Sequence, residues 1–417
     1  MQSWIETGAK HLWRPYAQMK TSPPALPVVR TEGTRIFLAD GRVLVDGIAS
    51  WWTACHGYNH PHIVDAMKRE IETMPHVMFG GLTHEPAARL AERLAALAAG
   101  DLDHVFFAES GSVSVEIAMK MAIQYWLNRG ERRRTKFVSF RGGYHGDTFA
   151  TMSVCDPEEG MHALFAGVLA PQIIADLPRE AETEEALDAV LAKHGGEVAA
   201  ILVEPLVQGA GGMLFHDGET LRRLRRLADK HDLLLIFDEI FTGFGRTGTM
   251  FAMEAAGVTP DIVTLSKALT GGTAPLSAAI ASKRVFDAFW SDDPSHALMH
   301  GPTYMAHALG CAAANASLDL FETGEWRGNV ARIERLLREG LEPCRDLPGV
   351  ADVRVRGAIG VVELQAAPDH GALNARFATR GVWIRPFNRI VYLTPAFVAS
   401  NDDVAHLTGA IRAELAA

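Results

Sequence analysis

Cysteine is scarce in this sequence, and charge of one sign is never concentrated in a long run. Four of the 417 residues are cysteine (Cys55, Cys155, Cys311 and Cys344), and no two of them form a C-x-x-C pair. This spacing argues against a disulfide framework or a zinc ribbon, and it predicts reduced structural thiols in a cytosolic protein. The formal net charge is −10 without any long basic run, so nucleic acid is not an expected partner.

Long apolar runs are missing as well. No stretch approaches the roughly 18 apolar residues of a membrane span. The opening MQSWIETGAK has no basic segment followed by an apolar one, so we expect neither a membrane anchor nor a secretory signal. The sequence has instead the balance of an ordinary globular protein, with 48% hydrophobic and 22% charged residues. Its length allows two or three domains.

The middle of the chain carries the strongest chemical signal. Leu233–Phe237 is a short continuous apolar run, typical of a parallel strand buried on both faces, and Asp238 follows it. A second such run, Ile262–Leu265, is followed closely by Lys267, 29 residues after Asp238. That spacing fits one β-crossover-β unit. An acid and an amine are therefore predicted at the carboxyl edge of one sheet, where open α/β sheets bind ligands.

Such a pair is what pyridoxal 5'-phosphate (PLP) chemistry requires. A lysine amine forms a Schiff base with the cofactor, and a carboxylate keeps the pyridine nitrogen protonated so that the ring accepts electrons. Either residue alone is more simply an ordinary surface lysine or strand-end aspartate. The pair at this spacing favours catalysis.

A glycine motif in the same stretch points to a different function. Gly243, Gly245 and Gly248 match G-x-G-x-x-G, the dinucleotide fingerprint, which would indicate a nicotinamide oxidoreductase. That fingerprint joins a strand directly to a helix and is followed by an acid about 20 residues later. Here five residues separate Phe237 from Gly243, and the candidate acid, Asp261, follows Gly248 by only 13. The match lacks its structural context and is disfavoured.

A phosphate site is predicted where a strand at Val105–Ala108 runs through ESGSV into a helix at Val113–Leu127. Free N–H groups and the positive end of the helix dipole attract phosphate. Gly111 lets the backbone approach the ligand, and Ser112 adds a hydroxyl donor. A plain serine N-cap is the alternative.

Aromatic and basic residues elsewhere complete a candidate site. Tyr144 follows Gly142-Gly143 on a tight turn and is suited to covering a flat ring. Trp51 and Trp52 are adjacent, so in an extended segment only one of them lines a cavity. Arg385, on an expected strand at Val382–Arg385, is a good clamp for a carboxylate, with a surface ion pair as the alternative. The nearby histidines are expected in a Gly-rich loop at 49–62 and not in a metal site, because no acid or cysteine lies at ligand spacing (His56, His60 and His62).

The remaining pattern predicts an α/β protein with a second, smaller unit. Further strands are expected at Thr34–Leu38, Arg42–Val45, Lys136–Phe140, Val198–Val203 and Ala278–Ala281, and helices at Pro86–Ala98, Thr220–Lys230 and Ala306–Phe321. Beyond residue 322 a charged helix (Val330–Leu341) precedes alternating β patterns (Val350–Val355 and Gly360–Leu364). We therefore expect a large domain at 49–321, a small α+β domain at 322–417, and an otherwise irregular segment at 1–48 that joins the small domain.

Long motifs resemble the class III (omega) aminotransferases. They include HLWRPY, SWWTACHGYNHP, HVMFGGLTHEPA, GYHGDTF, DEIFTGFGRTG, KALTGGT, MHGPT and GVWIRPF, and the similarity extends from residue 11 to about 395. The resemblance implies a PLP-dependent transferase of fold type I, in which helices flank a mainly parallel sheet. It also implies a cytoplasmic homodimer whose subunits share their active sites.

The resemblance assigns roles to residues that match the family motifs. It implies that Lys267 carries PLP and that Asp238 contacts the pyridine nitrogen. The other implied cofactor contacts are Gly111, Ser112 and Tyr144, together with Pro302 and Thr303, which reach the phosphate of the other subunit. The implied substrate contacts are Trp51, Tyr144, Lys267, Gly301 and Arg385, with Tyr16 assisting recognition.

The motifs are most similar to family members that act in biotin biosynthesis. The resemblance thus implies S-adenosyl-L-methionine as amino donor and 8-amino-7-oxononanoate as acceptor. Relatives that use ornithine or 4-aminobutyrate tend to carry a glutamate where Ala210 stands, which separates this chain from them. Lysine as donor, another omega-amino substrate, and a PLP-free binding protein are the alternatives. Asn388 stands where a glycine is expected, which affects the predicted loop shape.

Overall fold

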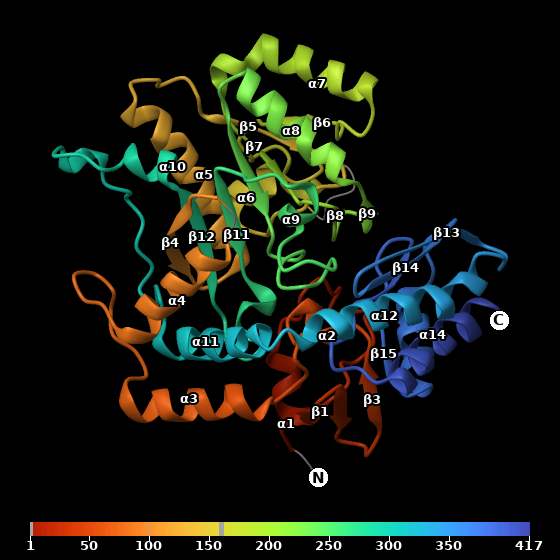
Figure 1. Ribbon diagram of the computed structural model, residues 1–417. Helices are drawn as coiled ribbons and strands as arrows, with labels where there is room; N and C mark the ends of the chain where they lie inside the picture. Colours follow the sequence, from red (N-terminus) through yellow and green to blue (C-terminus); the bar gives the residue numbers. More distant parts are fainter. Residues whose placement is uncertain (1–2, 99, 158–161) are drawn as a thin grey trace.

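A seven-stranded sheet forms the centre of the computed structural model, which describes residues 3–98, 100–157 and 162–417 (Figure 1). The strand order is β4-β12-β11-β10-β7-β5-β6. All strands run parallel except β12, which is antiparallel to both neighbours. The α/β class and the mainly parallel sheet are confirmed. The strands are β4 (Leu102–Ala108), β5 (Lys136–Phe140), β6 (Ile173–Ala175), β7 (Val198–Val203), β10 (Leu234–Asp238), β11 (Ile262–Leu265) and β12 (Ser277–Ser282).

The central strands are buried on both faces, which is why their sequences are continuous apolar runs. Successive side chains of β10 enter two different cores because they point to opposite faces of the sheet. Leu234 and Ile236 pack in the core that includes α5 (Gly111–Asn128). Leu235 and Phe237 pack in the other core, which includes the apolar side of α8 (Gly218–Lys230).

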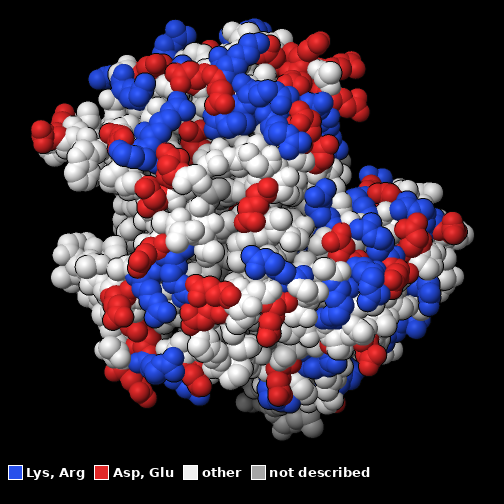
Figure 2. Space-filling model, viewed as in Figure 1, with Lys and Arg blue, Asp and Glu red and all other residues white. Residues whose placement is uncertain are grey.

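The arginines of α8 form a charged outer face, as the sequence predicts. Asp217 caps this helix, accepting a hydrogen bond from the N–H of Thr220 at 2.9 Å. Figure 2 shows basic and acidic side chains interleaved over this end of the molecule, where α8 lies beside α7 (Ala181–His194). The ion pairs join Arg222 to Glu219, Arg223 to Glu184, Arg225 to Asp229 and Asp261, and Arg226 to Glu184 and Glu219.

A smaller unit lies beside the large sheet (Figure 1). Its antiparallel sheet has the order β13-β14-β16 (Val350–Arg356, Ile359–Leu364 and Ile390–Leu393) and packs against α12 (Glu325–Leu341), which also contacts α14 (Asn401–Leu415). A further sheet combines both ends of the chain, in the order β1-β2-β3-β15 (Val28–Glu32, Arg35–Leu38, Val43–Asp46 and Val382–Trp383). The domain limits at residues 48 and 321 remain a prediction.

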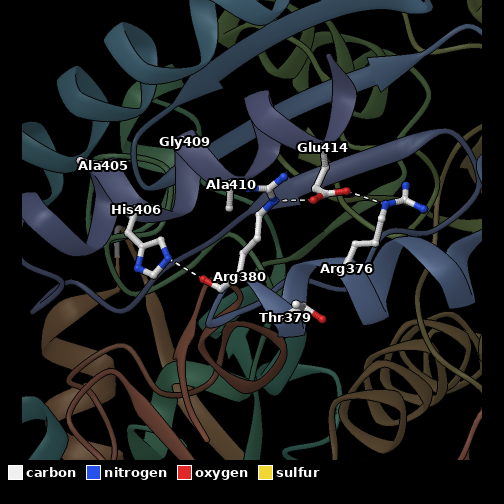
Figure 3. A pocket seen from close by; sticks show the side chains of 8 residues that line it. All are labelled: Arg376, Thr379, Arg380, Ala405, His406, Gly409, Ala410 and Glu414. Carbon is white, nitrogen blue, oxygen red and sulfur yellow. Dashed lines mark hydrogen bonds and ion pairs between the residues drawn. The ribbon is translucent and has the colours of Figure 1, made fainter. Parts of the chain in front are cut away.

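A buried carboxylate joins α14 to α13 (His370–Thr379) in the small unit. Glu414 accepts hydrogen bonds from Nε of Arg376 and Nε of Arg380, and His406 bonds to the carbonyl oxygen of Arg380 at 2.7 Å (Figure 3). These residues line an open cavity of about 720 Å³. None of its lining residues comes from the carboxyl ends of the large sheet, so it is separate from the predicted ligand site.

Several local predictions are wrong. Residues 28–32 form β1, although this segment was expected to be irregular. The loop expected at 49–62 is shorter than predicted, because α3 (Pro61–Thr73) begins at Pro61. β15 ends at Trp383, so Arg385 is not on a strand. Proline at position 386 has no N–H to donate and restricts the residue before it, which explains why the strand does not continue.

The segment carrying the two adjacent tryptophans is not extended. Ala49, Ser50, Trp51 and Trp52 all have positive φ, between 45° and 68°, and form the left-handed turn α2 (Ala49–Trp52). The alternation of faces expected for an extended segment therefore does not apply. Asn388 also has a positive φ, of 44°, a conformation that asparagine adopts more readily than most residues, so the loop keeps a glycine-like shape. No helix among the described residues is long and apolar enough to span a membrane.

Candidate active site

A cavity of about 170 Å³ lies at the carboxyl edge of the large sheet. It contains five of the residues predicted for a cofactor site, namely Gly111, Ser112, Tyr144, Asp238 and Lys267. The other lining residues are Trp52, His145, Gly146, Glu204, Gly209, Ala210, Ile240, Phe241 and Ser266. Strands β4, β5, β7, β10 and β11 all direct their carboxyl ends to this edge, which brings together segments far apart in sequence.

Lys267 follows β11 and presents its amine inside the cavity. Its Nζ lies 4.7 Å from the centre of the Trp52 ring and 6.0 Å from that of Phe241. Burial lowers the pKa of this amine, although the charges of Asp238 and Glu204 oppose the shift. A lowered pKa increases the share of neutral amine, which is the nucleophilic form. The backbone of Lys267 has a φ of 47°, and such strain is typical of functional sites.

Asp238 ends β10 on the strand beside β11. One carboxylate oxygen lies 2.8 Å from Nδ1 of His145, and the other accepts the N–H of Ile240 at 3.1 Å. Both members of the Asp238–His145 pair are almost completely buried. The predicted acid and amine thus line one cavity, and a histidine that the sequence analysis missed fixes the orientation of the acid.

A second carboxylate, Glu204, follows β7 and also lines the cavity. Its two oxygens accept the N–H groups of Gly209 at 2.9 Å and of Tyr144 at 3.0 Å. Burial raises its pKa to about 7, with the charge of Asp238 acting in the same direction and His145 opposing it. Glu204 was missed by the sequence analysis, although its position directly after a buried parallel strand was a usable signal.

The other end of the cavity is built by the start of α5. Ser110 caps the helix by accepting the N–H of Val113 at 3.4 Å, so the N-cap is Ser110 and Ser112 remains on the cavity side. The first N–H groups of a helix have no partner within it and attract anions. A side chain at Gly146 would place its Cβ 2.2 Å from Oγ of Ser112, so only glycine fits beside this hydroxyl.

Two tyrosines share one aspartate at the mouth of the cavity. Asp147 accepts hydrogen bonds from the hydroxyls of Tyr16 and Tyr144, the latter at 2.8 Å. Burial and the bond to Asp147 raise the pKa of Tyr16 to about 12, so its hydroxyl stays protonated. Tyr16 does not line the cavity but is connected to Tyr144 through this aspartate, which the sequence analysis did not identify.

Arg385 and Trp51 come from opposite ends of the chain and contact each other. The guanidinium carbon of Arg385 lies 4.9 Å from the centre of the Trp51 ring, a cation–π distance. The ring of Tyr16 stands edge-on to Trp51, with the centroids 6.4 Å apart. The predicted substrate contacts Trp51 and Arg385 are therefore brought together beside Tyr16.

Three further predicted residues lie outside the lining of this cavity, which Tyr16, Trp51 and Arg385 also do not line. Gly301, Pro302 and Thr303 lie in a loop before α11 (Ala308–Glu322), where Gly301 and Thr303 are exposed and none of the three lines the cavity. The roles of Gly301 at the substrate and of Pro302 and Thr303 at the phosphate of the other subunit stay predictions.

The residues of the cavity fit PLP. Lys267 supplies an amine, Asp238 a buried carboxylate, and the start of α5 a place for a phosphate group. The indole Nε1 of Trp52 is buried without a hydrogen-bond partner among the residues that the structure describes, as expected in a cavity built around a ligand. The segment Gly243–Gly248, by contrast, forms turns and does not join a strand to a helix, so the dinucleotide motif is not used here.

Comparisons with known proteins agree with this geometry. The sequence pattern of the family "Aminotransferase class-III" matches residues 16–415. A protein from Corynebacterium glutamicum, named adenosylmethionine-8-amino-7-oxononanoate aminotransferase, is 45% identical over 413 residues, which are 98% of this chain and 97% of the relative. A protein of the same name from Mycobacterium leprae is also 45% identical and covers 97% of this chain and 94% of its own.

Solved structures give the same result. The crystal structure of the enzyme of that name from Methanocaldococcus jannaschii has a TM-score of 0.93 at 30% identity, covering 99% of this chain and 98% of the other. An amine transaminase from an uncultivated Pseudomonas species, solved in its PLP-bound form, has a TM-score of 0.90 at 32% identity, covering 97% and 98%. The chain therefore belongs to the class-III aminotransferase family and is a PLP-dependent enzyme.

Proposed function

We propose that this enzyme transfers the amino group of S-adenosyl-L-methionine to 8-amino-7-oxononanoate, giving 7,8-diaminononanoate for biotin biosynthesis. The proposal is carried by the buried Lys267 amine and Asp238 carboxylate in one cavity, in a chain whose relatives carry the name of this reaction. A ping-pong mechanism uses one pocket for both half-reactions, so the donor leaves before the acceptor binds.

The cofactor contacts follow from the chemistry of the cavity. When bound, PLP supplies an electron sink for cleavage of a bond at the carbon that carries the amino group. Lys267 attaches the cofactor, and Asp238, oriented by His145, keeps a proton on the ring nitrogen. Gly111 and Ser112 hold the phosphate with backbone N–H and hydroxyl donors, and Tyr144 covers the ring.

Lys267 has a second role once it is no longer bonded to the cofactor. Its free amine would accept a proton from the substrate carbon that carries the amino group and later donate it, as a general base and acid. The lowered pKa supports this role, because an amine held fully protonated at neutral pH could not accept the proton. Trp52 and Phe241 form apolar walls beside the amine.

Arg385 binds the substrate carboxylate. Trp51 lies against its guanidinium, and within the described parts of the chain no acidic side chain forms an ion pair with Arg385. Both substrates carry a carboxylate, so this clamp serves both half-reactions. Tyr16, held by Asp147, assists recognition, and Gly301 contributes a further substrate contact.

We also infer a cytoplasmic homodimer with shared active sites. The loop with Pro302 and Thr303 is away from its own cavity, which supports a role at the phosphate of the other subunit. Exposed apolar side chains on nearby segments would be covered in such a dimer, notably Met299 at 76% and Tyr304 at 51% exposure. The four cysteines are free and buried, which suits a reducing compartment.

The test is a half-reaction with the PLP-loaded enzyme. S-adenosyl-L-methionine alone should discharge the visible absorbance of the bound cofactor within a single turnover, and 8-amino-7-oxononanoate should then restore it. Retention of the visible band with this donor, and its loss with ornithine, 4-aminobutyrate or lysine, would contradict the substrate assignment.

A further inference from the structure

A buried aspartate outside the cavity holds the turn that carries Trp52, which lines the cavity, and Trp51, which contacts Arg385. Asp46, at the end of β3, is only 2% exposed. Its Oδ1 accepts the N–H of Ile48 at 2.9 Å, and its Oδ2 accepts the N–H of Ser50 at 2.8 Å and the hydroxyl of Tyr58 at 2.6 Å. No ion pair to Asp46 exists among the residues that the structure describes, so neutral donors, which include the backbone of Ala49 as well, compensate its burial.

The turn needs such an anchor because its backbone is strained. Four consecutive residues with side chains have positive φ, the region that L residues avoid at a cost of roughly 1–2 kcal/mol each. Strained backbone of this kind persists only where the surrounding structure determines it. Asp46 binds the N–H groups on both sides of the first turn residue, Ala49, and so acts where the left-handed path begins.

The two tryptophans of the turn contact the two basic groups of the proposed chemistry. Trp52 lies against the Lys267 amine and also packs on Phe241, with ring centroids 4.6 Å apart. Trp51 lies against the guanidinium of Arg385. A shift of the turn would therefore move the neighbours of both groups together.

The same sheet also places Arg385. Asp46 pairs with Trp383 in the parallel β3-β15 ladder, and the N–H of Gly47 donates to the carbonyl oxygen of Trp383 at 2.9 Å. Arg385 follows two residues later. The β3-β15 ladder thus positions Arg385, and Asp46 at the end of this ladder positions Trp51, whose ring contacts Arg385.

We propose that Asp46 is a positioning residue for catalysis, whose carboxylate holds the left-handed turn so that Trp51 meets Arg385 and Trp52 meets Lys267. This inference rests on the proposed roles of Lys267 and Arg385. Nothing in the proposed chemistry requires Asp46 to touch the substrate or the cofactor.

Asp46→Asn tests the proposal. Both oxygens of Asp46 accept backbone N–H groups, and the substitution replaces one of these oxygens with an NH2 group, which can only donate. The variant should raise KM for the amino donor about tenfold or more, since an amide donor facing a backbone N–H leaves that buried N–H without an acceptor. The pH midpoint of the visible absorbance of the PLP-loaded enzyme should also shift, because that absorbance depends on the surroundings of Lys267. The titration needs no substrate, so failure of S-adenosyl-L-methionine as donor would contradict the proposed reaction and leave this test intact.

Asp403→Asn is the matched control. Asp403 is another buried carboxylate of the same region, bonded to Arg35 at 2.6 Å and to Thr34 at 3.0 Å, and it contacts neither tryptophan. Its removal should lower the thermal midpoint and leave KM and the absorbance titration unchanged. If Asp46→Asn behaves in the same way as this control, Asp46 is a structural residue and the proposal is wrong.

A milder variant covers the case in which Asp46→Asn does not fold. Tyr58→Phe removes the hydroxyl donor to Asp46 and leaves the backbone bonds in place. It should raise KM by about two- to fivefold and shift the absorbance titration in the same direction. Wild-type values for both would overturn the proposal.

Discussion

Single side chains carry the proposed chemistry, and the amine of Lys267 has the largest share of it. Lys267→Ala should abolish the covalent link to PLP and reduce turnover by at least about 10⁴-fold, the upper range for loss of a general base. Borohydride reduction followed by peptide mass spectrometry identifies the linked lysine. Lys283→Ala is the control, since Lys283 is an exposed residue paired with Asp287 at 2.6 Å and should behave as wild type. A reducible link at any other lysine would refute the assignment.

Asp238→Asn should lower kcat by about 100-fold or more while changing PLP affinity much less. The carboxylate stabilises charge that matters most in the transition state, and loss of such an interaction appears in kcat. Steady-state kinetics and a cofactor titration separate the two effects. A near-normal kcat in this variant would remove Asp238 from the proposed role.

Arg385→Ala should reduce kcat/KM with both substrates by about 30- to 150-fold, corresponding to roughly 2–3 kcal/mol for a partly buried charge pair. Arg389→Ala is the nearby control, because that side chain is half exposed and pairs with Glu363 at 3.0 Å. Separate half-reactions with donor and acceptor measure each effect. A defect confined to one substrate would mean that the other carboxylate binds elsewhere.

The acid and the amine could be predicted from the sequence because each follows a buried strand. Asp238 and Lys267 end neighbouring strands, and their spacing along the chain predicts this. His145 lies on the segment after β5, and β7 separates that strand from β10, so its contact with Asp238 depends on the strand order. Sequence periodicity does not reveal that order.

At the scale of elements, the strands of the large sheet were predictable because their burial forces continuous apolar runs. β5, β7 and β11 have the predicted bounds. β1 was missed because its residues are almost all exposed, which removes the apolar pattern. The left-handed turn α2 was missed because four consecutive residues with positive φ run against backbone preference, and only Asp46 and the surrounding packing maintain them.

The attachment of α14 to α13 gives a prediction about stability. Glu414→Gln should lower the thermal midpoint at pH 7 by about 1 °C for each kcal/mol lost in a chain of this length, because two charge-assisted hydrogen bonds weaken. Burial by itself would raise the pKa of Glu414, but Arg380 and Arg376 hold it below the ordinary value of 4.5. The stabilisation is therefore present above pH 4.5 and is lost as the pH falls through the lowered pKa.

Differential scanning calorimetry between pH 7 and pH 2.5 measures this difference, because that range includes the pH values at which the Glu414 carboxylate becomes protonated. Glu339→Gln serves as the control, because its ion pair with Arg335 is exposed on both sides and contributes little. A constant difference between Glu414→Gln and wild type down to the lowest pH would contradict the ionic origin.

At the scale of the whole molecule, subunit mixing tests the shared active site. Lys267→Ala and Thr303→Glu homodimers should both be inactive. If Thr303 serves the other subunit, each mixed dimer contains one intact site, and random mixing should restore about a quarter of wild-type activity. No recovery in verified mixed dimers would place Thr303 at its own cavity or outside the site.

We propose that this class-III aminotransferase takes its amino group from S-adenosyl-L-methionine, with Lys267 and Asp238 in the cavity and Arg385 against Trp51. Ala210 lines this pocket without a carboxylate to neutralise Arg385, so amines lacking a suitably placed carboxylate should react poorly. The most direct measurement is single-turnover mixing of the PLP-loaded enzyme with each donor, followed by visible absorbance. We expect rapid loss of the visible band with S-adenosyl-L-methionine and slow loss with ornithine, 4-aminobutyrate and lysine. Faster reaction with any of these three than with S-adenosyl-L-methionine would contradict the proposal.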